Sequence, residues 1–452
     1  MRRALALTLV AAGACADASV LVRIASDRPV GSGQVGGLDA ICLGAADDDP
    51  AGRHHGAVTR LAGAFATLPQ SLRIDAGEAS AARVWTVGFT GGVPVARAEA
   101  RTDFGDDLTL RLDRCGGGRA GPPAPRAGQA GPPGAVLAPL LGRTGWQVLA
   151  VGAASAELLD VAAGAWTSAP APAPPGPGVR TIVAVDLDGD CDDDAVVVDP
   201  SAPPALWLVE GAVVSEAGAL GASPAAAVAA ADVDRDGDAD LITGRGPDLA
   251  LYRNDGAGRF ALVDGAIISA GLVTDVTALA SGDLDGDGSP DLVVGQAGAP
   301  LRALFGDGAG AGTFLAAALA LPALPLTVTA LVLADADGDL DPDLWVGVDA
   351  APTRLYGNRA GLFDDQSFAL LPQPAPRARA LAVGSWDDAC APDAVLAGDG
   401  GATLLRGGGD GGRLDAAGAG PAGGSVVLVD LDDDGAGDVV IAGAAGVAWL
   451  AP

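Results

Sequence analysis

The chain of 452 residues contains no lysine and only two histidines, the adjacent His54 and His55. Aspartate greatly outnumbers glutamate, and the formal net charge at pH 7 is −30. This acidity disfavours nucleic acid or an anionic membrane surface as a partner, because contacts with phosphates would be repulsive. A solvated acidic surface would normally mix glutamate with aspartate, so we expect the aspartates to be placed for a geometric purpose.

Recognisable catalytic residues and motifs are also scarce. No histidine follows His55, which removes the commonest general base from most of the chain. The chain has no G-x-S-x-G or H-E-x-x-H motif and no phosphate-binding glycine loop. Aromatic residues make up only 4% of the chain, which leaves few side chains for stacking on sugars, and we expect Trp386 in the core. The sequence therefore predicts that the protein is not an enzyme.

The first residues have the pattern of an export signal. Two arginines precede an apolar stretch of eleven residues, Ala4 to Ala14, which is too short to span a bilayer. Residues 1–14 are therefore predicted to be a signal peptide. Cys15 follows "AAGA", which resembles a bacterial lipobox and predicts lipidation, although Ala12 stands where leucine is preferred. An A-x-A cleavage site is the alternative, so we expect an envelope lipoprotein attached to the membrane only by this anchor, or a secreted protein.

The region after Cys15 contains β-like runs. Residues 15–115 include alternating runs such as "SLRIDA" and "ARVWTVGF" and are predicted to form a small, sandwich-like β domain. Cys42 and Cys115 bracket this region and are expected to form a disulfide in an oxidising compartment. Residues 116–133 are rich in glycine and proline and have the composition of a linker.

From residue 134 onward, one pattern recurs near a fixed period. An apolar run leads into an acidic loop, as in "SGDLDGDGSPDLVVG" (281–295), and a second apolar run follows. The first loop position of successive copies falls at residues 139, 186, 232, 283, 335, 385 and 430, with steps of 45 to 52 residues. Repeats of this length indicate stacked units that share a core, so each motif is interpreted as part of a repeat.

Each unit has the pattern of three or four short strands. A third apolar run ends in a glycine turn and an aromatic residue, as in "LALYRNDGAGRF" (249–260). Short apolar runs bounded by glycine, aspartate and asparagine favour strands, and three or four strands per unit are typical of a propeller blade. The uncharged run 313–334 contains two prolines and falls within a repeat. We interpret it as an outer strand, a loop and an inner strand rather than a membrane span.

Together, the D-x-D-x-D-G-x-x-D loop, the apolar run and the aromatic turn resemble the FG-GAP/VCBS repeat of integrin α-subunit propellers and of bacterial surface and secreted proteins. The resemblance covers residues 134–452 and implies an all-β fold, a seven-bladed β-propeller preceded by the small β domain. The last copy ends early, so its blade is expected to have three strands or to be closed by a strand from the N-terminal side of Gly134. The family serves adhesins, lectins and accessory domains of enzymes, so the resemblance does not select one function.

The acidic loops are predicted to bind calcium. Ca²⁺ takes six to eight oxygen ligands, and a tight loop with aspartate at positions 1, 3, 5 and 9 can direct several carboxylates at one ion. The copy at Ser385 lacks acids at positions 1 and 5 and is expected to be empty or weak. Five copies keep all four aspartates, which predicts about five sites, with the ligands Asp186, Asp188, Asp190, Asp194, Asp232, Asp234, Asp236, Asp240, Asp283, Asp285, Asp287, Asp291, Asp335, Asp337, Asp339, Asp343, Asp430, Asp432, Asp434 and Asp438.

Other interpretations of these loops fit less well. An EF-hand needs a glutamate at position 12, where the five complete loops have residues that favour strands. A solvated acidic loop would not keep the same spacing through five copies. A glycosidase acid–base pair is one asymmetric site, whereas equivalent loops form a structural pattern.

These features predict an exported, calcium-stabilised β-propeller that is expected to be a monomer and to bind a protein or glycan at the cell surface. A polysaccharide-active enzyme or its accessory domain is one alternative. A structural envelope protein without a specific ligand is another. Cys191 and Cys390 share one loop position in two repeats and are expected to be thiols.

Overall fold

The computed structural model describes strands before residue 131 and most of the chain after it. The described residues from there on are 131–142, 145–162, 165–190, 192–263, 265, 273–287, 289–307, 313–320, 327–334, 336–337, 341–349, 351–384, 386, 393–408, 412–429, 431 and 437–451.

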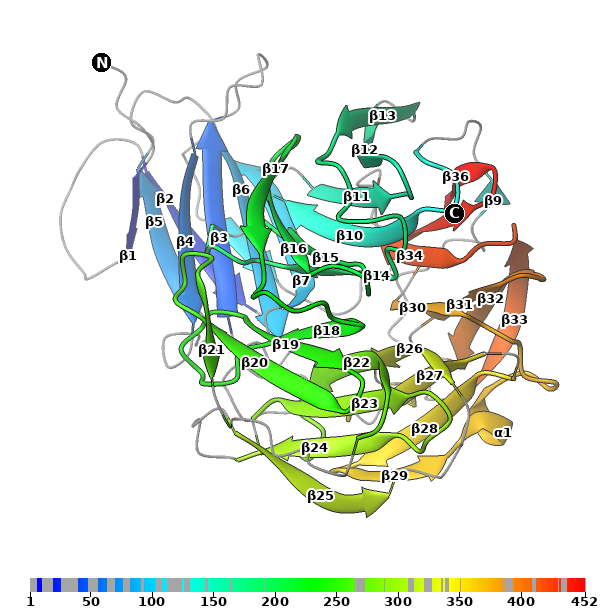
Figure 1. Ribbon diagram of the computed structural model, residues 1–452. Helices are drawn as coiled ribbons and strands as arrows, with labels where there is room; N and C mark the ends of the chain where they lie inside the picture. Colours follow the sequence, from blue (N-terminus) through cyan, green and yellow to red (C-terminus); the bar gives the residue numbers. More distant parts are fainter. Residues whose placement is uncertain are drawn as a thin grey trace.

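Seven four-stranded antiparallel sheets form the repeat region of the described chain (Figure 1). The first sheet contains β10 (Val136–Gly142), β11 (Gly145–Val151), β12 (Ala156–Ala162) and β13 (Ala165–Pro170). The second contains β14 (Thr181–Val185), β15 (Asp194–Val198), β16 (Ala205–Glu210) and β17 (Val213–Ala219). The third contains β18 (Ala227–Ala231), β19 (Asp240–Arg245), β20 (Asp248–Asn254) and β21 (Phe260–Val263). The fourth sheet contains β22 (Val276–Gly282), β23 (Asp291–Gln296), β24 (Arg302–Gly306) and β25 (Phe314–Ala320). The fifth contains β26 (Val328–Leu333), β27 (Leu344–Val348), β28 (Arg354–Arg359) and β29 (Leu362–Asp365). The sixth contains β30 (Ala380–Gly384), β31 (Asp393–Gly398), β32 (Gly401–Gly408) and β33 (Gly412–Gly420). The seventh contains β34 (Ser425–Val429), β35 (Asp438–Gly443), β36 (Gly446–Ala451) and β9 (Ala124–Pro125).

The sheets are arranged as the blades of a ring. The first strands of neighbouring blades contact one another in turn, and the circle is completed by contact between β34 and β10. Helix is nearly absent from the described residues, where α1 (Ser367–Leu370) forms a single turn. The protein is therefore an all-β, seven-bladed β-propeller, which confirms the fold class predicted from the repeats.

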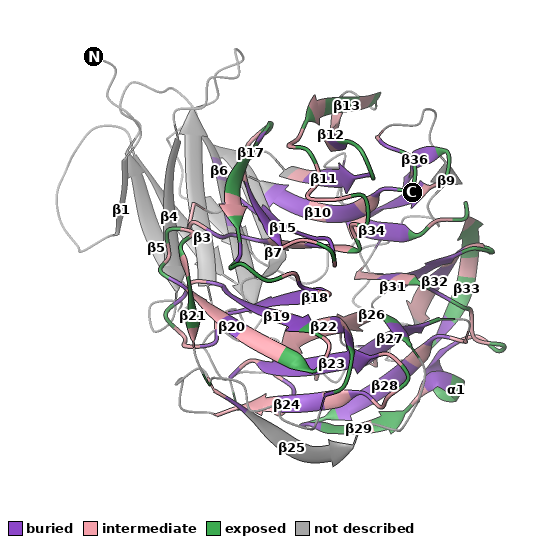
Figure 2. Cartoon of the chain, viewed as in Figure 1, coloured by how far each residue is buried: buried purple, intermediate pink, exposed green. Residues whose placement is uncertain are grey.

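The second strand of each blade shows why apolar runs without alternation form strands here. All five residues of β15 are buried, and their side chains alternate between the two faces of the sheet. Val197 packs in a cluster with the first blade, through Leu149, whereas Val196 packs with the third blade, through Leu241. Both faces of such a strand are thus buried between neighbouring blades, while the outermost strand β17 is largely exposed (Figure 2).

A strand from before the repeats completes the last blade. β9 pairs antiparallel with β36, with Ala124 opposite Ala451 and Pro125 opposite Leu450. Of the two closures expected from the short final repeat, the structure shows the one that uses a strand from the N-terminal side of Gly134. β9 lies within residues 116–133, so part of the glycine- and proline-rich segment belongs to the seventh blade.

The strands before residue 116 form two further sheets of four strands each. One has the order β1-β5-β2-β8 and the other the order β4-β3-β6-β7, formed by β1 (Ala6–Leu9), β2 (Ser19–Ala25), β3 (Ala40–Asp47), β4 (Gly56–Ala62), β5 (Gln70–Asp75), β6 (Ala82–Thr90), β7 (Val93–Thr102) and β8 (Leu108–Arg111). The sandwich-like domain and the signal peptide, in which β1 lies, stay predictions. Cys42 lies on β3, whereas Cys15, Cys115, Cys191 and Cys390 lie outside the described residues, so the lipidation at Cys15 and the disulfide also stay predictions.

The long uncharged run folds as the repeat pattern predicts. Residues 314–320 form the outer strand β25 and residues 328–333 the inner strand β26 of the next blade. Across the described residues, no helix has the length and apolar character needed to cross a membrane.

Candidate metal centres in the acidic loops

Each acidic loop, named here by the number of its blade, connects the first strand of that blade to the second. Loop two joins β14 to β15, loop three joins β18 to β19, and loop four joins β22 to β23. The position-12 residues of these loops, Val197, Thr243 and Val294, lie within the second strands. The helices of an EF-hand are therefore replaced by strands.

Three loops bring carboxylates together closely enough for one ion. In each loop, one oxygen from each of three aspartates lies within 4.8 Å of the others. The groups are Asp186, Asp188 and Asp194 in loop two; Asp232, Asp234 and Asp236 in loop three; and Asp283, Asp285 and Asp291 in loop four. Loops two and four thus combine positions 1, 3 and 9, whereas loop three combines positions 1, 3 and 5.

A left-handed turn at position 4 brings the ends of each loop together. Gly189 and Gly286 have φ angles of 80° and 79°. Their N–H groups donate at 2.8 Å to the position-1 carboxylates of Asp186 and Asp283. Loop three reaches the same region of backbone space with Arg235, at φ 62°. Glycine is favoured there because it has no β-carbon to clash with the backbone.

The position-5 carboxylates accept hydrogen bonds from backbone N–H groups of their own loops. Asp190 and Asp287 accept hydrogen bonds from the N–H groups two residues later, at 2.9 and 2.7 Å, and fall outside the close groups of their loops. Asp236 makes the same turn with Asp238 at 3.0 Å yet belongs to the close group of loop three.

Two buried carboxylate oxygens support a cation in these loops. Oδ1 of Asp188 and Oδ1 of Asp234 are buried and accept no hydrogen bond from any described group. An unpaired buried anionic oxygen is costly, and hard carboxylate oxygens are the kind of donor that Ca²⁺ prefers. The donor set is entirely oxygen, which favours Ca²⁺ over Zn²⁺. The residues present therefore fit a bound calcium ion.

The position-9 aspartates have a second role that does not depend on a metal. In loops two to six, Oδ2 accepts the N–H of position 2 in the loop, and Oδ1 accepts an N–H of the third strand, at 2.7 to 3.1 Å. The aspartates are Asp194, Asp240, Asp291, Asp343 and Asp393, and the third-strand donors are Val209, Asn254, Gly306, Asn358 and Gly407. Asp438 of loop seven accepts the position-2 N–H of Leu431 in the same way. We call this arrangement the position-9 brace.

The brace aspartates are buried, which changes their protonation. Burial raises the pKa of Asp194 to about 8 and the pKa values of Asp240 and Asp291 to about 7, neighbouring carboxylates raise them further, and the bracing N–H donors oppose the shift. A raised pKa means that the ionised form is disfavoured in the metal-free fold. A cation next to these groups would restore the ionised form.

Loop six keeps the brace although it lacks two of the four acids. Asp393 is buried and accepts the N–H groups of Trp386 and Gly407, each at 3.0 Å. Trp386 is fully buried, which confirms that it is a core residue. A loop that lacks acids at positions 1 and 5 has thus retained the aspartate needed for the brace.

The next blade covers two of these loops. Nδ2 of Asn254, in blade three, donates to the carbonyl of Leu187 in loop two at 2.8 Å. Nδ2 of Asn358, in blade five, donates to the carbonyl of Leu284 in loop four at 2.9 Å. The order of these loops is therefore coupled to the packing between blades. Both asparagines belong to the aromatic-turn pattern of the sequence, but their contacts with another repeat could not be inferred from it.

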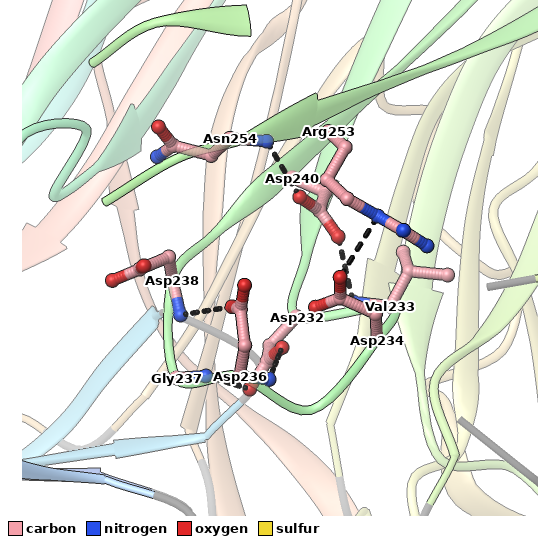
Figure 3. A network of polar contacts seen from close by, with 9 residues as sticks. All are labelled: Asp232, Val233, Asp234, Asp236, Gly237, Asp238, Asp240, Arg253 and Asn254. Carbon is pink, nitrogen blue, oxygen red and sulfur yellow. Dashed lines mark hydrogen bonds and ion pairs between the residues drawn. The ribbon is translucent and has the colours of Figure 1, made fainter. Parts of the chain in front are cut away.

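Loop three differs from its neighbours because an arginine of the third strand forms an ion pair with one of its aspartates. Nε of Arg253, on β20, lies 2.8 Å from Oδ2 of Asp234 (Figure 3). Burial and Asp236 raise the pKa of Asp234, and the guanidinium of Arg253 opposes that shift. The predicted ligand pattern does not include this residue, and the signal that could have revealed it is an arginine directly before the asparagine of the third-strand turn.

The structure tests the other predicted ligands only in part. Asp337 and Asp343 of loop five are described, and Asp343 forms its brace with the N–H groups of Ala336 and Asn358. In loop seven, Asp438 is described and buried. The predicted ligands Asp335, Asp339, Asp430, Asp432 and Asp434 lie outside the described residues.

A ring of blades with an acidic loop between the first and second strands defines the protein as a repeat β-propeller. Residues 232–294 and 283–346 each match the family model of the FG-GAP-like repeat. The protein is therefore a seven-bladed propeller that carries FG-GAP-like repeats at residues 232–346.

Comparisons with other proteins add no functional assignment. The comparison with curated proteins finds no match. Similar solved structures include an Agrocybe aegerita lectin, described for specific recognition of non-reducing terminal N-acetylglucosamine (16% identity, 65% of this chain and 83% of that chain, TM-score 0.43). Others are BBS1N in complex with ARL6DN (12%, 74% and 96%, TM-score 0.48) and the BP39L lectin from Burkholderia pseudomallei (16%, 75% and 95%, TM-score 0.41). With TM-scores below 0.5, these likenesses do not identify a ligand for this protein.

Proposed function

We propose that the protein is an exported, calcium-stabilised propeller that acts as a binding protein at the cell surface and not as an enzyme. The observation that carries the calcium part is the convergence of three aspartate oxygens within 4.8 Å in each of loops two, three and four. The buried, unpartnered oxygens of Asp188 and Asp234 support the same proposal.

Calcium would act on stability through the loops that hold it. Asp186, Asp188 and Asp194 would hold one ion in loop two, and Asp283, Asp285 and Asp291 another in loop four. When bound, the ion supplies positive charge that offsets repulsion between the carboxylates. Because Asn254 and Asn358 attach these loops to the next blade, an ordered loop would also stabilise the interface between blades. A ligand that binds the folded state alone stabilises it by mass action.

Counting bound ions tests the calcium proposal. Isothermal titration of the calcium-free protein should show at least two tight sites, and Asp285→Asn should remove one of them. Asp415→Asn is the matched control, because Asp415 is exposed on β33 and its substitution removes the same charge away from every loop. The absence of calcium binding by the wild-type protein, or equal loss in the two variants, would contradict the proposal.

The binding role at the surface has separate support. The signal-like segment 1–14 and Cys15 favour export, and no histidine lies in the propeller to act as a general base. Propellers present the loops between strands at the two ends of the ring, where a ligand can be contacted without further secondary structure.

Three experiments test the anchoring and the ligand class. Palmitate labelling of the expressed protein should be lost in Cys15→Ser, and unlabelled wild-type protein in the medium would instead indicate secretion without an anchor. Saturable binding on a glycan array that is lost after calcium removal would support a glycan ligand. A protein ligand is supported if the glycans are not bound and the purified protein binds in a saturable way to cells treated with glycosidases.

A further inference from the structure

We propose that Arg253 is a built-in counter-ion of loop three, and that it makes this loop the weakest calcium site among loops two, three and four. The inference rests on the proposed calcium sites and concerns the order in which they fill. It assigns to Arg253 the role of lowering the calcium affinity of loop three.

The contact itself places a cation at a predicted ligand. Nε of Arg253 lies 2.8 Å from Oδ2 of Asp234, whose side chain is only 14% exposed. Figure 3 shows the arginine reaching from β20 toward Asp234, beside the brace aspartate Asp240. One oxygen of Asp234 is therefore already neutralised, while its other oxygen is buried and accepts no hydrogen bond from a described group.

In the other two loops, no charged side chain occupies the position that corresponds to Arg253, the third-strand residue directly before the brace donor. The third-strand N–H that donates to the brace comes from Val209 in blade two, Asn254 in blade three and Gly306 in blade four. The residue before it is Leu208, Arg253 or Phe305, respectively. Within the described part of the chain, no ion pair is formed by the position-3 aspartates of loops two and four, Asp188 and Asp285.

Blade six has an arginine at the same position of its third strand, and its acidic loop lacks two of the four acids. The brace donor there is Gly407, and the preceding residue is Arg406. Position 1 of this loop is Ser385 and position 5 is Ala389, so two of the four acids are missing in the blade that carries this arginine. An arginine in this register thus accompanies a degenerate acidic loop in blade six and an altered one in blade three.

The geometry of loop three agrees with a weaker site. Its close group uses the exposed Asp236 in place of the buried brace aspartate Asp240. Both oxygens of Asp232 accept backbone N–H groups, from Asp236 at 3.1 Å and Gly237 at 3.0 Å. Calcium must therefore compete with Arg253 for Asp234 and with backbone donors for Asp232.

The magnitude follows from the exposure of the ion pair. The side chain of Arg253 is 36% exposed, so the pair is partly screened by solvent. A partly exposed pair contributes about 1 kcal/mol, which corresponds to about fivefold in a dissociation constant. We expect the concentration of calcium that half-fills loop three to fall by about fivefold when this charge is removed.

A site-resolved measurement tests the inference. Hydrogen exchange of the full chain, followed by mass spectrometry at graded calcium concentrations, reports the midpoint of protection for peptides from loops two, three and four separately. The variant Arg253→Gln removes the counter-ion. Arg259→Gln is the matched control, because Arg259 pairs with Asp255 on the same hairpin and its side chain is 80% exposed.

The expected result has two parts. In the wild-type protein, loop three is protected at a higher calcium concentration than loops two and four. Arg253→Gln lowers that midpoint by about fivefold, while Arg259→Gln changes it by less than about twofold. If Arg253→Gln does not fold, the order in which the three loops become protected in the wild-type protein still tests whether loop three is the weakest site.

The contrary results are distinct. Equal midpoints in the two variants, or a loop three that fills together with or before the others, would overturn the role of Arg253 while leaving the calcium sites intact. If calcium protects none of the three loops, the proposed function fails and this inference fails with it.

Discussion

Substitution of Asp393 separates the structural role of the position-9 aspartates from calcium binding. Loop six lacks acids at positions 1 and 5, so its aspartate acts as a brace without a predicted metal site. Asp393 is buried and accepts the N–H groups of Trp386 and Gly407 at 3.0 Å. Asp393→Ala leaves both donors without this acceptor.

The expected loss follows from those two hydrogen bonds. An unsatisfied buried N–H costs about 1–3 kcal/mol, and the half-buried N–H of Gly407 falls at the lower end of that range. We therefore expect Asp393→Ala to lower the free energy of unfolding by about 2–4 kcal/mol. Asp393→Asn keeps one acceptor oxygen and should lose about half as much.

Urea unfolding followed by tryptophan fluorescence measures this loss. The decrease should be the same in calcium and in EGTA, because loop six is not expected to bind the ion. Asp415→Ala, an exposed position in the same blade, is the control and should change stability by less than about 0.5 kcal/mol. The brace would be refuted by a loss in Asp393→Ala no larger than in the control.

Three further predictions concern the loops with complete acids. Asn254→Ala removes the hydrogen bond to the carbonyl of Leu187 and should lower the free energy of unfolding by about 1–3 kcal/mol, and no change in the urea midpoint would contradict the coupling between blades. In EGTA, stability should fall as pH rises from about 4 to about 8, because the pKa values of Asp194 and Asp291 are higher in the fold than their ordinary value of 3.8. Calcium should reduce this fall in stability. Urea midpoints at pH 5.5 and 8.5, measured with calcium and with EGTA, test this. A fall between the two pH values that is as large with calcium as with EGTA would argue against metal binding by these groups. Asp188→Asn should abolish the calcium-induced protection of loop two in hydrogen exchange and leave that of loop four, whereas loss of protection in both would indicate global unfolding.

The architecture of the ring could be predicted from the sequence because the same order of strands and loops recurs in every repeat. The spacing of the acidic loops located the junction between first and second strands, and the strand-forming residues at position 12, such as Val197, excluded helices there. Burial of Trp386 also followed from its register, since siblings carry aliphatic residues at that position. Patterns within one repeat are local, and repetition makes them visible.

Contacts between repeats could not be predicted in the same way. The closing strand Ala124–Pro125 has no apolar alternation, and its pairing with β36 depends on the backbone. The contacts of Asn254 with Leu187 and of Arg253 with Asp234 require the positions of strands that the sequence does not supply. The double role of position 9 was hidden because a metal ligand and a brace both require a carboxylate.

Thermal unfolding with and without calcium tests whether the acidic loops bind calcium and stabilise the fold. We expect the melting temperature to be higher by several degrees in excess calcium than in EGTA, since each ion at 100 times its dissociation constant adds about 2.7 kcal/mol. Magnesium at the same concentration should restore less, because it demands a stricter octahedral geometry. The same melting temperature in calcium and in EGTA would contradict the claim that the acidic loops of this propeller are calcium sites.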